Sequence, residues 1–107
     1  MKQLFINKKA TIKDALLKIS KSGHRCLLVT DNLEKMLGTI SDGDLRRAIL
    51  KNQNLGQKID KIYKKNPRFF YSKNYNLKKV KELFIKNKLD LIPVLDKTKK
   101  VEKIIFW

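Results

Sequence analysis

The sequence predicts a mixed α/β (α+β) fold in which one β-α-β-β-α unit occurs twice in tandem, the second copy being truncated. The chain has 107 residues, of which 42% are apolar, so it can bury one modest core but not two large ones. Residues 4–20 align without gaps with residues 69–85, and the same offset of 65 residues aligns 27–41 with 92–106. Because helical spacing of apolar residues precedes strand-like spacing in both copies, we expect two copies of one supersecondary unit, packed together.

Each copy opens with a strand that leads into an amphipathic helix. Residues 68–75 mix aromatic and basic side chains, as platforms for single-stranded nucleic acid do, but they align with the start of the chain and so favour a buried strand. Thr11 and Asn76, which are equivalent in the alignment, are suitable helix N-caps. The apolar positions at helical spacing are Ile12, Ala15, Leu16 and Ile19 in the first copy and Leu77, Val80, Leu83 and Phe84 in the second.

Two further strands follow the helix in each copy. Residues 26–31 and 91–96 are short apolar runs that end in aspartate, and each leads through a polar turn to a second apolar run, at 36–40 and 101–106. This pattern is typical of paired strands. In the first copy, residues 44–52 then return to helical spacing and predict the last helix of the unit.

A connector at residues 55–70 separates the two copies. Ile59 and Ile62 are spaced for a short helix, and Pro67 ends it. The sequence therefore predicts a connector with a short helix between the two units.

The chain divides into a first unit with its connector helix, residues 1–62, and a second unit, residues 63–107. Trp107 aligns with Asp42, so the second unit lacks its final helix. Because that helix would cover apolar core surface, we expect the chain to be an N-terminal module of a longer polypeptide.

The formal net charge of +16 would ordinarily suggest a nucleic acid or an anionic membrane surface as the partner. Most of the basic residues are lysines spread through the chain, however, and no known nucleic-acid-binding signature accompanies them. No apolar run approaches the about 20 residues of a membrane span, and none suits a signal peptide. We interpret the charge as a solvated lysine-rich surface and expect neither a membrane nor a nucleic acid as partner.

The sequence does not bring together the residue types that catalysis or metal binding needs. Cys26 is the only cysteine and His24 the only histidine, so we expect neither a disulfide within the chain nor a metal site. No Walker motif, dinucleotide fingerprint or serine nucleophile motif is present. We therefore expect a cytoplasmic chain that is not itself an enzyme, with no catalytic residues and no required cofactor.

The stretch LGTISDGDLRRAI, residues 37–49, carries the candidate site. A helix that begins near Asp44 would direct unsatisfied backbone N–H groups and a positive dipole end at the preceding turn, where an anion is stabilised. The Ser41 hydroxyl suits a phosphate or a ribose, and the Asp44 carboxylate, which only accepts hydrogen bonds, suits two ribose hydroxyls. Gly38 and Gly43 permit a close backbone approach, and Gly43 also permits a positive φ in the turn. The alternative is that Ser41 and Asp44 only cap the helix.

The repeated unit, with glycine, two residues, serine, two residues and aspartate at its end, resembles the cystathionine β-synthase (CBS) domain. Two such domains in tandem resemble a Bateman module. The resemblance covers nearly the whole chain, including ATIKDALLKI, LLVTD, the connector and NLKKVKELFIKNKLDLIPVLD. It implies a pseudo-twofold pair of α/β units with clefts between them, which often bind adenosine nucleotides (AMP, ADP or ATP) to regulate an attached enzyme or channel.

The resemblance also assigns roles to individual residues. It implies that Asp44 binds the ribose, that Ser41 contacts the ribose or the phosphate, and that Thr39 lies on the strand that flanks the base. Arg25, just before the apolar run at 26–31, stands at a position that is often basic in nucleotide-binding members, where a guanidinium can reach phosphate. A solvent-exposed arginine without a ligand is the alternative.

Thr11 and Ile12, just before the first helix, are further candidates that the resemblance implies, here for lining the base pocket. The second unit departs from the motif, because Lys103 aligns with Gly38 and Phe106 with Ser41, while the position of Asp44 has no counterpart. We therefore expect one functional nucleotide cleft. The ending KVEKIIFW also resembles the close of CBS pairs that precede bacterial sugar-phosphate nucleotidyltransferases.

The sequence is compatible with three functions. The leading hypothesis is a regulatory module that senses an adenosine nucleotide and modulates an attached catalytic domain of the same polypeptide, a nucleotidyltransferase, with dimerisation through its helices. The alternative is a ligand-free module that dimerises a larger protein. A basic nucleic-acid-binding domain is the third, and it requires binding that survives physiological salt.

Overall fold

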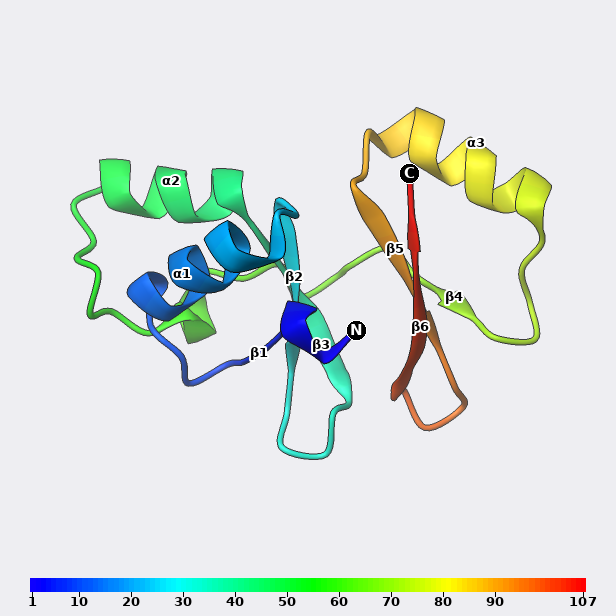
Figure 1. Ribbon diagram of the computed structural model, residues 1–107, viewed down its shortest axis with the longest axis horizontal. Coiled ribbons are helices and arrows are strands. Elements are labelled where there is room, and N and C mark those ends of the chain that lie inside the picture. The colour runs from blue at the N-terminus through cyan, green and yellow to red at the C-terminus, as the bar shows by residue number, and fades with distance from the viewer.

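The computed structural model describes all of residues 1–107 as two three-stranded sheets with three α-helices, the two units lying side by side along the longest axis of the molecule (Figure 1). The predicted α+β class with two tandem units is confirmed. The first unit contains η1 (Lys2–Leu4), β1 (Phe5–Asn7), α1 (Ile12–Ser22), β2 (Cys26–Thr30), β3 (Met36–Ser41) and α2 (Asp42–Leu50). The connector contains η2 (Ile59–Lys61), and the second unit contains β4 (Phe70–Tyr71), α3 (Leu77–Asn87), β5 (Leu91–Leu95) and β6 (Val101–Phe106).

Both sheets are built in the same way. In each, the first strand pairs parallel with the second, and the second pairs antiparallel with the third, in the orders β1-β2-β3 and β4-β5-β6. The two hairpins share an irregularity, a register shift between Val29 and Thr30 in one and between Val94 and Leu95 in the other. These positions are 65 residues apart, so the structure confirms the alignment down to the placement of a bulge.

Equivalent residues of the two units meet at a pseudo-twofold axis between the hairpins. Lys35 and Lys100, which the repeat aligns with each other, form an isolated antiparallel bridge. The Met36 N–H donates to the Lys99 carbonyl at 2.9 Å. Glu34 and Lys99, another aligned pair, both have positive φ, 63° and 70°. The two copies therefore share their turn geometry as well as their strands.

The main core extends across the boundary between the units. Leu91, Leu95 and Val101 of the second sheet belong to the same buried cluster as the apolar residues of the first unit. A smaller cluster lies under α3 and consists of Val80, Phe84 and Ile92. Because one cluster contains residues of both sheets, burial of apolar surface holds the units against each other.

Helix α1 begins as the sequence predicts. Thr11 is its N-cap, and a capping box joins it to Asp14, whose N–H donates to the Thr11 hydroxyl at 3.1 Å while its carboxylate accepts the Thr11 N–H at 3.0 Å. These hydrogen bonds from Thr11 lower the pKa of the Asp14 carboxyl. The helix ends at Gly23 with a φ of 74°, a left-handed conformation that glycine adopts without steric cost.

Helix α2 begins at Asp42, two residues before the predicted start near Asp44. Ser41 is the N-cap, and Asp44 stands in the first turn instead of at its beginning. Gly43 is likewise inside the helix, and Gly23 is the one glycine with positive φ, so Gly43 does not adopt the positive φ that it permits and does not form the preceding turn. The physical reason is the capping box between Ser41 and Asp44, which is satisfied only when the two intervening residues are helical.

The connector crosses between the units and hydrogen-bonds to both ends of the first one. The predicted short helix is a single 3-10 turn, η2, in which Ile59 is fully buried. Its Ile59 N–H donates to the Ala10 carbonyl at 2.9 Å. Further along, Thr39 of β3 and Lys64 exchange two backbone hydrogen bonds, of 3.0 and 2.8 Å. Figure 1 shows this segment passing behind the first unit before it reaches β4.

The second unit is less enclosed than the first. Leu77 at the start of α3 is 74% exposed, whereas its equivalent Ile12 is 0% exposed under the connector. The predicted opening strand is only two residues long, and it is not fully buried, since Phe70 is half-buried and Tyr71 exposed. The strand stands at the edge of its sheet and pairs only with β5, and only Phe70 packs against the small cluster under α3. None of the helices has the length and apolar character that a membrane span requires.

Candidate functional site

A cleft of about 460 Å³ lies between the two units and brings part of the predicted site together. We call it the inter-unit cleft. The first unit contributes Cys26, Thr39, Ser41 and Asp44; the connector contributes Lys64, Asn66, Pro67 and Arg68; and the second unit contributes Asn87, Lys88, Leu89 and Asp90. Three predicted residues, Thr39, Ser41 and Asp44, therefore face one cavity whose opposite wall belongs to the other unit.

Ser41 and Asp44 form the second capping box of the chain. The Asp44 N–H donates to the Ser41 hydroxyl at 3.1 Å, and the Asp44 carboxylate accepts the Ser41 N–H at 2.9 Å. Ser41 and Asp44 thus cap α2 in the structure. Capping does not use all the hydrogen-bonding capacity of these groups, because the hydroxyl can still donate its proton and the carboxylate keeps unused lone pairs.

Asp44 is the most buried charged group of the cleft. Its side chain is 7% exposed, and its Oδ1 accepts a hydrogen bond from Arg47 Nη2 at 2.6 Å. A buried carboxylate needs such a partner, because an unpaired buried charge costs several kcal/mol. The pair therefore holds a negative acceptor at the wall of the cleft without an uncompensated charge.

Thr39 and Ser41 are placed by the geometry of β3. They lie two residues apart, so their side chains point to the same face of the strand, and both line the cleft. The backbone of Thr39 is tied to Lys64 of the connector by the two hydrogen bonds described above. Gly38 makes this pairing possible, because a Cβ there would overlap the Lys64 carbonyl oxygen and lie 2.7 Å from the Tyr63 ring. The backbone approach that Gly38 permits is made here by the connector.

Arg25 lies on the other side of Ser41, outside the inter-unit cleft. It lines a second cavity of about 430 Å³ together with Ser41, Gly43 and the start of α2. The Asp42 N–H donates to the Arg25 carbonyl at 2.8 Å, which fixes the arginine backbone beside the helix N-terminus. Ser41 borders both cavities, and so does Asp90. A ligand seated at Ser41 could therefore place an anionic group toward Arg25.

Thr11 and Ile12 lie away from the inter-unit cleft. Thr11 caps α1 and forms an isolated bridge with Lys58, and the Ile12 N–H donates to the Gln57 carbonyl at 2.9 Å. Ile12 is fully buried. In this structure both residues hold the connector against the first unit, and neither lines the cavity that contains Asp44.

Three cationic residues of the cleft were not predicted as site residues. Lys64 and Arg68 come from the connector, and Lys88 ends α3 in a left-handed conformation with a φ of 50°. Sequence reasoning assigned the lysines to a solvated surface. The available signal was the position of Lys88, which aligns with the helix-terminating Gly23, although that alignment alone does not show which cavity the side chain borders.

Cys26 lines the cleft as a half-buried side chain. Burial raises the pKa of its thiol to about 12, with smaller contributions from the Asp90 and Asp44 carboxylates. The thiol therefore stays protonated at neutral pH and is a poor nucleophile. No group of three or more metal-ligating side chains lies close enough to hold a metal ion.

The second unit has an aromatic contact where the first has its open cleft. Phe106, the equivalent of Ser41, stacks on His24, the equivalent of Leu89, with ring centroids 4.5 Å apart and planes 22° apart. Ser41 and Leu89 both line the inter-unit cleft, whereas their equivalents touch each other. At the pseudo-twofold counterpart of the cleft, two aromatic rings are thus in contact.

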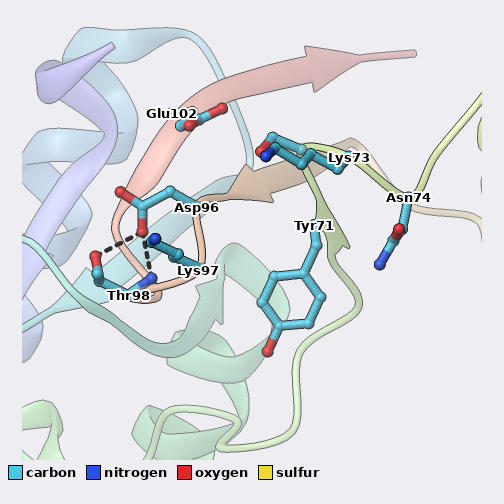
Figure 2. A pocket seen from close by; sticks show the side chains of 8 residues that line it. Tyr71, Lys73, Asn74, Asp96, Lys97, Thr98 and Glu102 are labelled. Atoms are coloured by element: carbon cyan, nitrogen blue, oxygen red, sulfur yellow. Dashed lines mark hydrogen bonds between the residues drawn. The ribbon is translucent and has the colours of Figure 1, made fainter.

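A larger cavity, of about 580 Å³, lies elsewhere, beside the hairpin turn of the second unit. Its side chains, shown in Figure 2, are Tyr71, Ser72, Lys73, Asn74, Asp96, Lys97, Thr98 and Glu102. Asp96 turns toward Thr98, whose N–H and hydroxyl donate to it at 2.7 and 2.6 Å and lower its pKa (Figure 2). Because these bonds stabilise the turn itself, and because no predicted residue lies here, this cavity is not the candidate site.

Comparison with known proteins identifies the fold. Residues 1–51 match the family model described as CBS domain. A CBS domain protein from Pyrobaculum aerophilum, solved in complex with AMP, superposes with a TM-score of 0.82 at 14% identity, over 96% of this chain and 79% of that one. CBSX2 in complex with AMP superposes with a TM-score of 0.79 at 22% identity, over 95% of this chain and 79% of that one. At such identities the likeness concerns the fold, which is that of a CBS domain pair.

Two curated relatives come from Helicobacter pylori, and both are described as uncharacterized proteins. The relative from strain J99 is 34% identical over 92 residues, which is 85% of this chain and 28% of the relative. The relative from strain 26695 is 28% identical over 91 residues, again 85% of this chain and 28% of the relative. The chain therefore spans less than a third of the length of these relatives.

Proposed function

We propose that this chain, which has the fold of a CBS domain pair, is a regulatory module whose inter-unit cleft binds an adenosine nucleotide. The observation that carries the proposal is the buried Asp44 carboxylate at the wall of a cleft built from both units. Two proteins with this fold were solved with AMP bound, which supports the same ligand class here.

The ligand would occupy the cleft in a defined orientation. Asp44 accepts hydrogen bonds from the ribose hydroxyls, since an ionised carboxylate has no proton to donate. Pro67 and Leu89 offer apolar surface for the base, and Thr39 flanks it from β3. Ser41 is the N-cap of α2, where its hydroxyl, the positive end of the helix dipole and Arg25 favour phosphate. Thr11 and Ile12 would act only indirectly, by holding the connector.

Regulation follows from the position of the cleft. A ligand there touches the first unit, the connector and the second unit at once, so it favours whichever arrangement brings these three segments closest together. A ligand shifts an equilibrium only by its difference in affinity for two states, so the module must have a second arrangement of its units. The target would be a catalytic domain of the same polypeptide, for which we propose a cytoplasmic nucleotidyltransferase, and the module would dimerise through its helices.

A ligand-free assembly module is the second candidate function. Two observations favour it: the aromatic contact of His24 and Phe106 at the counterpart of the cleft, and the capping box that already gives Ser41 and Asp44 a structural role. In this case the module would only hold two copies of a larger protein together.

Calorimetric titration separates the two functions. We expect AMP, ADP or ATP to bind with a stoichiometry of one nucleotide per chain, because the cleft keeps the acceptor and its counterpart has two aromatic rings in contact. Asp44→Ala should abolish this binding. Asp96→Ala is its matched control, since it removes an aspartate from the larger cavity beside the second hairpin and should leave the affinity unchanged. Absence of binding heat with any nucleotide, together with a dimer that persists on dilution in sedimentation, would instead support the assembly module.

A further inference from the structure

We propose that Arg47 is a positioning residue that makes the cleft selective for ribonucleotides over 2′-deoxyribonucleotides. The inference rests on the proposed function, because it concerns how Asp44 meets the sugar. Arg47 does not line the inter-unit cleft. It acts through the carboxylate, which it holds from behind at 2.6 Å.

The hydrogen bonds of the Asp44 carboxylate leave one lone pair free on each of its two oxygens. Oδ1 accepts from Arg47 Nη2 at 2.6 Å, and Oδ2 accepts from the Ser41 N–H at 2.9 Å. A carboxylate offers about four lone-pair positions, so about two stay free, one on each oxygen. The two vicinal hydroxyls of a ribose are a matching pair of donors. A 2′-deoxyribose supplies only one of them and would leave a buried acceptor without a partner, which is costly.

Arg47 and the Ser41 N–H together fix the plane of the carboxylate. The Arg47 side chain is 62% exposed and reaches from solvent to a carboxylate that is 7% exposed. Without the guanidinium only the Ser41 N–H would hold the carboxylate, and the side chain could rotate so that its free lone pairs no longer face two hydroxyls at once.

The neighbouring Arg46 provides a matched comparison. It also pairs with an aspartate at 2.6 Å, but its partner Asp42 has a side chain that is 34% exposed. Both residues line the second cavity beside Arg25 and not the inter-unit cleft, so Arg46→Met controls for the sugar preference and not for the overall affinity. Exposed pairs of this kind contribute little to stability. Arg46 and Arg47 thus differ in the group they hold and not in the length of their ion pair.

The test measures the dissociation constants of AMP and of 2′-deoxy-AMP for the native chain and for three variants, Arg47→Met, Arg47→Lys and Arg46→Met. We expect the native chain to prefer AMP by roughly tenfold or more, as expected when a charged buried acceptor loses one hydrogen bond. Arg47→Met should reduce this preference to about threefold or less. Arg47→Lys restores a positive charge and one donor nitrogen, so it should recover an intermediate preference. Arg46→Met should keep the native preference.

The preference ratio distinguishes positioning from a general structural role. If Arg47 only stabilised α2, both sugars would lose affinity equally and the ratio would stay native, which would overturn the inference. If Arg47→Met binds neither nucleotide, the ratio of the two dissociation constants is measured in Arg47→Lys instead. A native ratio in that variant counts against positioning. A native chain that binds no nucleotide would contradict the proposed function itself, and a native chain that binds both sugars equally would contradict only the present inference.

Discussion

Replacing Gly38 with alanine should lower the free energy of unfolding by about 3 kcal/mol, the upper part of the range for forcing extra volume into a packed site. The added Cβ would overlap the Lys64 carbonyl oxygen and press on the Tyr63 ring. The Lys64 carbonyl is part of the backbone and accepts the Thr39 N–H at 3.0 Å, so it cannot move away without breaking the pairing between β3 and the connector. Urea unfolding followed by circular dichroism measures this loss.

Gly56→Ala is the matched control for this prediction. A Cβ on Gly56 meets only the Asn54 side-chain oxygen, at 3.4 Å, and the φ of Gly56 is not positive. We expect its effect to stay within about 0.5 kcal/mol, as for most surface substitutions. Equal losses at Gly38 and Gly56 would show that the connector is not held against β3 as the structure describes.

Ser41→Phe should abolish nucleotide binding, lowering the affinity by more than about a hundredfold. The substitution gives the first unit the residue that the second unit has at Phe106, whose ring stacks on His24. The equivalent of His24 in the cleft is Leu89, so the new ring would lie between the first unit and Leu89, where the nucleotide must enter. Calorimetric titration with AMP and ATP measures the loss.

Ser41→Ala separates occlusion of the cleft from loss of the helix cap. Both substitutions remove the hydroxyl that caps α2, and each should cost about 1 kcal/mol of stability for that reason. Only phenylalanine fills the cleft, so Ser41→Ala should bind more weakly than the native chain but measurably. Binding by Ser41→Phe at the level of Ser41→Ala would place the nucleotide outside the inter-unit cleft.

Much of the fold could be predicted because the two units repeat. The alignment at an offset of 65 residues identified both hairpins, and the shared bulges at Val29 and Val94 follow from it. The start of α2 was placed two residues late, because Asp42 and Gly43 lack the apolar spacing of a helix. The capping box between Ser41 and Asp44 was the signal that would have placed it correctly, since serine and an acidic residue three positions later mark a helix start.

The candidate site could be predicted only where it is local in sequence. Thr39, Ser41 and Asp44 lie within six residues, so the geometry of one strand and one helix turn brings them together. Lys64 and Lys88 reach the same cavity from the connector and from the end of α3, and this depends on how two units pack. Spacing within a single sequence does not contain that information. Arg47 was not predicted for a related reason, because its proposed role depends on the burial of Asp44, which the sequence does not show.

Thermal unfolding of the native chain and of Asp44→Ala, with AMP, ADP, ATP, GTP and CTP, tests the central claim most directly. At a ligand concentration near a hundred times the dissociation constant, binding stabilises the folded state by about 2.7 kcal/mol, which raises the Tm of a chain of this size by roughly 10 °C. We predict this rise with adenosine nucleotides for the native chain and none for Asp44→Ala. Unchanged Tm values for the native chain with all five nucleotides, or an equal rise in Asp44→Ala, would contradict the assignment of Asp44 to the ribose.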